Sequence, residues 1–397
     1  MKHVFSLIIL TLIGLAAYAQ QSFMGPRPIV SPEINADHTV TFRLRAPEVG
    51  SVKLTGDFLP TTQVDTPMGK MDMPGEVELT RNEEGLWEYT TPEALQPELY
   101  SYSLIVDGLQ IADPNNVYQI RDIASITNYF IVEGERADLY KVGDVAHGTV
   151  AKVWYHSESF GVDRRMTVYT PAGYESSGER YPVLYLLHGM GGDENAWCDL
   201  GRATQILDNL IAQGKAEKMI VVMPNGNVVQ QAAPGEDAEG LVVPQRMLPK
   251  SMEGSFETAF PEIMEFIEST YRTVNEKSGR AIAGLSMGGF HALHISKQYP
   301  DRFDFVGLFS AAIMPLREGS SPIYDDMDAK LKKQFENKPA VYFIAIGDAD
   351  FLYRSNASYR QKLDELGCAY TYRESGEGHI WKNWRIYLTE FVPMLFK

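Results

Sequence analysis

The second half of the chain alternates continuous apolar runs with helical patterns, and this alternation constrains the fold more than any other feature. An unbroken apolar run is typical of a strand that is buried on both faces. Such runs cover residues 181–187, 219–223, 281–283, 305–309 and 341–346. Helical patterns lie between them, for example over residues 260–271. Buried strands that alternate with helices predict an α/β domain with a mostly parallel, doubly wound sheet over residues 150–397.

The first half of the chain has a different periodicity. Polar and apolar residues alternate over residues 39–46 and 100–106, as they do in a strand with one buried face. The second run ends at an Asp-Gly pair, which is a strong signal for a hairpin turn. Several short strands of this kind predict a small all-β sandwich domain over residues 25–135. The polar residues 136–149 are predicted to form a linker to the α/β domain.

Three motifs of the β-region stand in an order that resembles the starch- and xylan-associated carbohydrate-binding modules related to the N-terminal domain of isoamylase. They are Gly56-Asp57-Phe58, Tyr100-Ser101-Tyr102 and Val106-Asp107-Gly108 with Asp113-Pro114. Such modules often carry a Trp after Gly-Asp, where this chain has Phe58. The resemblance implies the sandwich fold and leaves two roles open, because sandwiches serve many functions. The domain either binds glycan or braces the α/β domain.

The N-terminus has the features of an export signal. Lys2 precedes an apolar run over residues 4–17, and Ala17-Tyr18-Ala19 forms a small-x-small cleavage site. The apolar run is short for a membrane span. We therefore predict a cleavable signal peptide over residues 1–19 and a secreted or periplasmic product.

The formal net charge of −16 argues against some classes of partner. A strongly acidic chain is repelled by nucleic acid and by anionic membranes, so we expect neither nucleic-acid binding nor membrane insertion. Cys198 and Cys368 do not make a disulfide framework, and both are expected to be small buried residues. No Cys/His cluster has metal-ligand spacing, so no metal is expected. His291 and His294 are predicted to be packing residues.

Residues 284–289 read Gly-Leu-Ser-Met-Gly-Gly and match the pattern G-x-S-x-G, with a strand before it and a helix after it. At such a sharp turn, side chains next to Ser286 would collide with neighbouring backbone, so Gly284 and Gly288 remove the obstacle. The turn exposes the Ser286 hydroxyl at the N-terminus of the helix. The pattern predicts an α/β-hydrolase sheet with Ser286 as the nucleophile.

A serine nucleophile needs a base, which an acid in turn orients. In α/β hydrolases the chain order is Ser, acid, His. His379 lies in a glycine-rich loop after a strand over residues 369–373, and we predict that it is the base. The acid is expected just after the strand over residues 341–346, where Asp348 and Asp350 are both candidates. We favour Asp350, because Asp348 suits the turn itself.

The oxyanion of a tetrahedral intermediate needs two backbone N–H donors. Met287 directly follows the nucleophile and is predicted to supply one. The other is expected from the glycine-rich loop over residues 188–192, with Met190 as the prediction and Gly191 as the alternative. His188 is expected to organise this loop and not to act as a second base.

Three further motifs resemble the putative esterase family, which includes feruloyl esterases, acetyl xylan esterases, S-formylglutathione hydrolase and the mycolyltransferases. They are Leu187-His-Gly-Met-Gly-Gly-Asp-Glu-Asn-Ala-Trp197, Gly284-Leu-Ser-Met-Gly-Gly289 and Gly378-His-Ile-Trp381. Among these enzymes, the two-domain feruloyl and xylan esterases of carbohydrate esterase family one, from gut bacteria, are most similar. The resemblance implies that the acid is Asp350, that the oxyanion donors are Met190 and Met287, and that no cofactor or metal is used. It also implies feruloylated or acetylated xylan and oligosaccharides as substrates.

The substrate is constrained less tightly than the chemistry. Trp197, Trp381 and Tyr353 are candidates for stacking on a feruloyl ring or a sugar. The long polar stretch over residues 228–255 either borders the pocket or forms a disordered excursion. A feruloyl esterase is the first hypothesis, an acetyl xylan esterase the second and a trilactone siderophore esterase the third, since the acidic chain disfavours anionic catecholates. The alternative of a different class is a catalytically silent glycan-binding protein.

Overall fold

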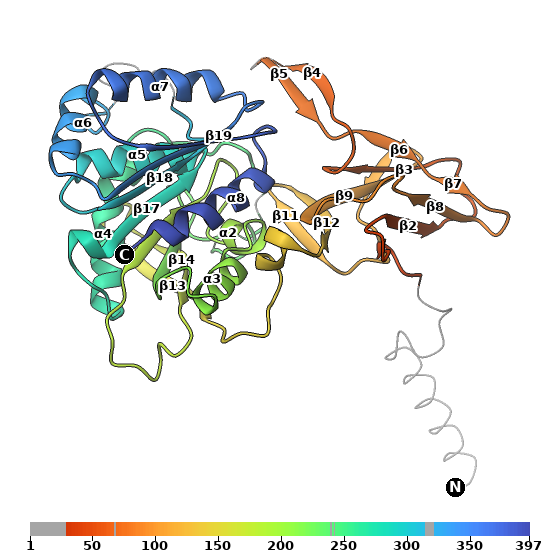
Figure 1. The fold of residues 1–397 in the computed structure, drawn as a ribbon, viewed down its shortest axis with the longest axis horizontal. Helices are drawn as coiled ribbons and strands as arrows, with labels where there is room; N and C mark the ends of the chain where they lie inside the picture. Colours follow the sequence, from red (N-terminus) through yellow and green to blue (C-terminus); the bar gives the residue numbers. More distant parts are fainter. Residues whose placement is uncertain (1–28, 67–68, 239, 242, 314–320) are drawn as a thin grey trace, which may run out of the picture.

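The computed structural model describes residues 29–66, 69–238, 240–241, 243–313 and 321–397. The predicted signal peptide over residues 1–19 lies outside these residues. A region of antiparallel strands lies beside a larger region of strands and helices (Figure 1). Among the described residues, no helix combines the length and the apolar character that crossing a bilayer requires.

The N-terminal region consists of two antiparallel sheets and a hairpin. The first sheet has the order β1-β2-β8-β7, with bounds Glu33–Ile34, Val40–Arg45, Leu86–Thr90 and Thr80–Arg81. The second has the order β11-β12-β9-β3-β6, with bounds Gln119–Asp122, Ser125–Val132, Glu98–Val106, Val52–Gly56 and Glu76–Glu78. Strand β10 (Leu109–Ile111) pairs with β9 across the Asp-Gly turn, and β4 (Thr62–Thr66) pairs with β5 (Gly69–Met73).

One hydrophobic core joins these two sheets into a sandwich. Val40 and Phe42 of β2 belong to the same buried cluster as Leu54 of β3 and Leu104 of β9. Phe58 packs against this cluster, and its ring stacks on that of Phe42 with 5.4 Å between the centroids. The predicted sandwich fold is therefore confirmed, and Phe58 serves its core.

The C-terminal region is built on one sheet of eight strands with the order β13-β14-β16-β15-β17-β18-β19-β20. In this order the bounds are Thr149–Ser157, Val162–Thr170, Ile220–Pro224, Val183–Leu187, Arg280–Leu285, Phe305–Phe309, Val341–Gly347 and Thr371–Ser375. The first three strands pair antiparallel, and all pairs from β16 to β20 are parallel. The carboxyl ends of the parallel strands consequently meet at one edge of the sheet.

Helices cover both faces of this sheet. Four pack into the core on one face: α4 (Ser255–Thr270), α5 (Met287–Gln298), α6 (Met327–Glu336) and α7 (Tyr353–Glu365). Three lie on the other face: α2 (Ala196–Asp199), α3 (Ala203–Ala212) and α8 (Trp381–Phe391). Val183 and Tyr185 of β15 point into the first core, whereas Leu184 and Leu186 point into the second. This arrangement confirms the predicted doubly wound α/β fold.

The connection between the two regions is packed against the α/β domain. The predicted linker over residues 136–149 contains most of the short helix η1 (Glu135–Leu139), and Tyr140 directly after it is fully buried. The Arg202 guanidinium donates a hydrogen bond of 2.8 Å to the Tyr140 carbonyl. Strand β13 then begins at Thr149, an edge strand that the sequence pattern did not reveal.

Contacts between side chains also join the two regions. Arg385 of α8 donates to the Glu98 carboxylate at 3.1 Å and to the Leu99 carbonyl at 2.8 Å, both on β9. Ile120 of β11 packs against Leu200 in a small cluster at the boundary. The sandwich and the α/β domain therefore share buried surface.

The residues predicted to pack behave mostly as expected. His291 and His294 are both buried on α5. Cys198 and Cys368 are free thiols, of which Cys368 is buried and Cys198 only partly so.

Candidate active site

Ser286 lies at the turn between β17 and α5, in a backbone conformation that L-residues rarely adopt. Its φ is 52° and its ψ is −115°. The neighbouring backbone holds this turn: the Ser286 amide donates to the Phe309 carbonyl at 2.9 Å, and the Ser286 carbonyl accepts from the amide of Ala312 at 2.9 Å. The turn therefore keeps its strained geometry because strand β18 and the segment after it are bonded to it.

The glycines beside Ser286 are required by close packing. A Cβ atom on Gly284 would lie 2.4 Å from the carbonyl of Gly288. A Cβ atom on Gly288 would lie 2.3 Å from the carbonyl oxygen of Leu187 at the end of β15. Both distances are far inside van der Waals contact, as the sequence pattern predicted.

His379 pairs with Asp350. The distance between His379 Nδ1 and Asp350 Oδ2 is 2.9 Å, and the Asp350 carboxylate is buried. The other carboxylate oxygen accepts a hydrogen bond of 2.9 Å from the Leu352 amide, which fixes its orientation. Asp348 is exposed, and its amide is bonded to the Ser375 carbonyl. Of the two candidate acids, the structure places Asp350 against the imidazole.

A pocket of about 380 Å³ brings the predicted residues together. Ser286 and His379 both line it, and so does Met190 of the loop after β15. Met287 is the first residue of α5, where backbone N–H groups have no partner within the helix. The other apolar and aromatic residues of the lining are Ile123, Ala196, Leu200, Met247, Leu285, Phe351, Trp381 and Trp384.

One of the three predicted stacking residues lies in this pocket. Trp381 lines it. Trp197 is only 1% exposed and donates its indole N–H to the Leu187 carbonyl at 2.9 Å. Its ring packs edge-to-face against that of Trp381, with 5.4 Å between the centroids, so it supports Trp381 and does not line the pocket itself. The Tyr353 hydroxyl lies outside the lining and donates to Glu374 at 2.8 Å. Arg246 and Met247 line the pocket, so the polar stretch over residues 228–255 borders it.

His188 uses both ring nitrogens to hold the loop after β15. Nδ1 lies 2.7 Å from the Gly189 carbonyl, and Nε2 accepts a hydrogen bond of 2.8 Å from the Gly226 amide. An imidazole that donates at one nitrogen and accepts at the other is neutral. Burial lowers the pKa of His188 to about 4, which keeps it neutral at physiological pH. It therefore organises the loop, as predicted.

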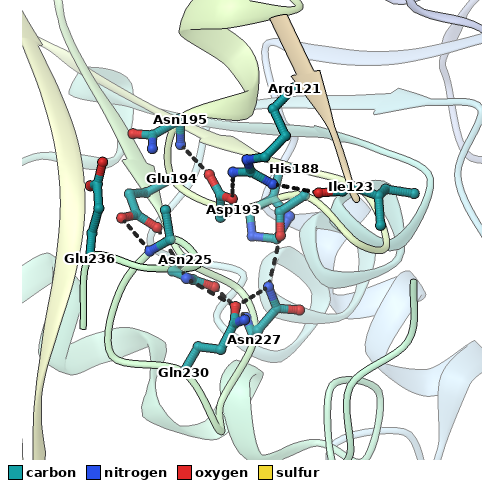
Figure 2. Close-up of polar contacts among 12 residues, drawn as sticks. Arg121, Ile123, His188, Asp193, Glu194, Asn195, Asn225, Asn227, Gln230 and Glu236 are labelled. Atoms are coloured by element: carbon teal, nitrogen blue, oxygen red, sulfur yellow. Dashed lines mark hydrogen bonds and ion pairs between the residues drawn. The ribbon is translucent and has the colours of Figure 1, made fainter. Parts of the chain in front are cut away.

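A buried polar network continues from His188 and could not be found from sequence spacing (Figure 2). Glu194 is fully buried and accepts from Arg165 Nε at 2.7 Å, from the Ala233 amide at 2.9 Å and from Asn225 Nδ2 at 3.1 Å. Burial raises the pKa of Glu194. The network joins β14, the loop after β15 and the loop after β16, so it fixes the loop that carries Met190.

Asn383 of α8 holds the loop of His379. Its Nδ2 donates to the carbonyls of Gly376 at 3.0 Å and of Gly378 at 2.9 Å. Its Oδ1 accepts from the Ser375 hydroxyl at 2.9 Å. A buried Asn with all these partners locks the loop in one conformation, yet nothing in its sequence position distinguishes it from a surface residue of the helix.

The low pKa of His188 predicts a pH-dependent stability. Its pKa in the folded state lies below the ordinary value near 6.5, so the folded protein binds fewer protons than the unfolded chain between the two values. The stabilisation is complete above about pH 6.5 and is lost as the pH falls towards 4, by up to about 3 kcal/mol. We expect His188→Gln to flatten this part of the dependence, measured as the free energy of unfolding in denaturant from pH 7 to pH 4.5. A variant with the same slope as the wild type would contradict the assignment.

The chain is similar to several known proteins. An endo-1,4-β-xylanase/feruloyl esterase of Xylanibacter ruminicola is 29% identical over 388 residues, which cover 92% of this chain and 46% of that protein. The chain thus spans about half the length of this relative. The structure of a ferulic acid esterase from the anaerobic fungus Anaeromyces mucronatus, with 26% identity and a TM-score of 0.53, covers 64% of this chain and 93% of that one.

Two further findings define the fold and the family. The enterobactin esterase of Shigella flexneri has 17% identity and a TM-score of 0.59, and it covers 89% of this chain and 92% of that one, so the likeness in fold includes the N-terminal region. The sequence model of the putative esterase family matches residues 157–395. The chain therefore belongs to the putative esterase family.

Proposed function

We propose that the protein is a secreted serine esterase that hydrolyses feruloyl esters on plant cell-wall xylan through an acyl-Ser286 intermediate. The observation that carries the proposal is the contact of 2.9 Å between the buried Asp350 carboxylate and His379, which lines the same pocket as Ser286. Export rests on the signal-peptide pattern at residues 1–19.

The geometry supports acyl transfer in two stages. In the first, His379 accepts the Ser286 hydroxyl proton while Oγ attacks the ester carbonyl carbon, and Asp350 stabilises the imidazolium. The N–H groups of Met287 and Met190 are proposed to bind the oxyanion. His379 then gives the proton to the departing sugar oxygen, which leaves ferulate bound to Ser286 as an ester. In the second stage, His379 takes a proton from water, the resulting nucleophile cleaves this ester, and Ser286 recovers its proton.

The lining of the pocket supports an aromatic acyl group. Phe351, Trp381 and Trp384 offer ring surfaces on which a hydroxycinnamoyl ring can stack. The charged lining residues are Arg121, Arg246, Asp122, Asp193 and Asp199. Since acids outnumber bases there, the pocket is not the basic site that an anionic catecholate would need.

Ser286→Ala and His379→Ala are each expected to abolish hydrolysis of every ester. Members of a triad act as a unit, so kcat falls by about 10⁴-fold or more. The measurement is steady-state hydrolysis of p-nitrophenyl acetate, with melting curves to show that the fold persists. Ser176→Ala, at an exposed serine, is the matched control. Near-normal activity in either triad variant would exclude the mechanism.

Asp350→Asn is expected to cost far more activity than Asp348→Asn. An amide at position 350 would present its N–H₂ to Nδ1, holding His379 in the wrong tautomer, and it would not stabilise the imidazolium. A loss of about 10⁴-fold in kcat is expected for this variant. The same isosteric change at the exposed Asp348 serves as the control, and a larger loss there would exchange the two assignments.

A substrate panel tests the proposed specificity. We expect kcat/KM for methyl ferulate to exceed kcat/KM for acetylated xylan, expressed per acetyl ester, and kcat/KM for a catecholate trilactone. An acetyl group offers no ring to the aromatic lining, and the pocket is not the basic site that an anionic catecholate needs. Liberated acid is measured by chromatography under identical conditions. Faster release of acetate from xylan would assign the protein as an acetyl xylan esterase, and a preference for the trilactone would assign a siderophore esterase.

A further inference from the structure

We propose that the turn between β11 and β12, in the N-terminal sandwich, is part of the active site: Arg121 is a positioning residue for the loop after β15, and Ile123 is a specificity-determining wall of the pocket. This inference rests on the proposed esterase function. It assigns the sandwich a direct part in the reaction, beyond either glycan capture or general support.

The pocket that holds Ser286 and His379 is composite. Arg121, Asp122 and Ile123 line it, although they belong to the sandwich. The register of the hairpin pairs Asp122 with Ser125, so Ile123 is the first of only two residues in the turn. A tight hairpin from the N-terminal region thus reaches the edge of the α/β sheet at which the strands β15 and β17 end.

Arg121 ties this hairpin to the loop after β15 (Figure 2). Its guanidinium forms an ion pair with Asp193 and donates to the Ile123 carbonyl at 2.9 Å. The Asp193 carboxylate is almost completely buried, and its other oxygen accepts from the Asn195 amide at 2.9 Å. Asp193 lies three residues after Met190, so the ion pair holds the segment that carries the proposed oxyanion donor.

Ile123 covers the backbone of the same loop. A Cβ atom on Gly191 would lie 2.7 Å from Ile123 Cγ1 and 3.2 Å from Arg246 Cα, which shows how closely the three segments meet. The φ of Ile123 is 55°, a conformation that suits Gly and is a genuine outlier for a β-branched residue. A strained residue whose side chain meets the active-site loop indicates a role in the site.

General support of the α/β domain does not require these contacts. Arg385 with Glu98, and Ile120 with Leu200, already join the two regions at the boundary. The Arg121 and Ile123 contacts are distinct because they reach the loop that borders Ser286. Their loss should therefore change catalysis more than it changes folding.

Arg121→Met tests the positioning role. We expect kcat to fall by about tenfold or more for both methyl ferulate and p-nitrophenyl acetate, less than the ~10²–10³-fold loss when a donor is removed outright. KM should change less, because the loop acts on the oxyanion of every ester. Arg121→Lys, which keeps the charge, should recover part of kcat.

Arg43→Met is the matched control, because Arg43 pairs with Glu33 and Glu88 wholly within the sandwich. It should stay within about twofold of the wild type, the ordinary outcome for a partly exposed ion pair remote from the site. Equal losses in the Arg43 and Arg121 variants, or wild-type kcat in Arg121→Met, would overturn the positioning role.

Ile123→Gly tests the wall. Glycine accepts the positive φ, so the hairpin should keep its conformation while the pocket loses an apolar surface. We expect the ratio of kcat/KM for methyl ferulate to that for methyl acetate to fall by about tenfold, the effect of a lost apolar contact in a pocket. An unchanged ratio would overturn the specificity role.

Equilibrium binding separates this inference from the proposed function. Ferulate binding, followed by the fluorescence of the pocket tryptophans, needs no turnover and should weaken in Ile123→Gly. A double-mutant cycle of Arg121→Met and Asp193→Asn on thermal unfolding should show coupling without any substrate. If the wild type hydrolyses no ester while both effects appear, the proposed function fails and the composite pocket stands. If neither effect appears, the composite pocket is wrong.

Discussion

The strained, positive-φ backbone at Ser286 is the constraint on which the rest of the site depends. Because the chain turns there from β17 into α5, the first turn of the helix passes against the end of β15, and only Gly288 leaves room for the Leu187 carbonyl. Leu187 pairs in parallel with Gly284, so the loop after β15 must begin beside the nucleophile. The presence of Met190 and Ser286 in one pocket is therefore a consequence of strand register and of one missing Cβ atom.

The same register explains how much of the site could be predicted. Ser286, Asp350 and His379 each follow a strand of one parallel sheet, and carboxyl ends of parallel strands meet at one edge. Buried apolar runs located those strands, and local motifs located the residues after them. Where the pattern was weak, as in the edge strand β13, the prediction missed the element because half-exposed edges carry little periodic signal.

Other residues could not be predicted because their roles come from tertiary contacts alone. Glu194, in the loop after β15, is held by Arg165 of β14 and by Asn225 and the Ala233 amide of the loop after β16. A carboxylate in such a network costs stability unless each partner is present, so the network specifies one loop conformation. Trp197 shows the opposite error: its sequence position beside the loop suggested a substrate contact, but its indole N–H is used by the Leu187 carbonyl beneath the pocket. Residue type alone does not separate a lining ring from a supporting one.

Hydrophobic periodicity divides the chain into two regions, but it does not reveal the contacts between them. Alternating strands and buried strands each mark a region with its own core, and both cores exist. Periodicity, however, shows only which face of a helix or strand is buried. Ile123 lies in a turn, where there is no periodic pattern to read. Its side chain meets Gly191 because the hairpin ends there, and Arg121 meets a buried Asp193 for the same reason. A region that reads as a separate module in sequence can thus complete a site that lies in its neighbour, and the ends of hairpins, where periodic patterns stop, are where such contacts should be sought.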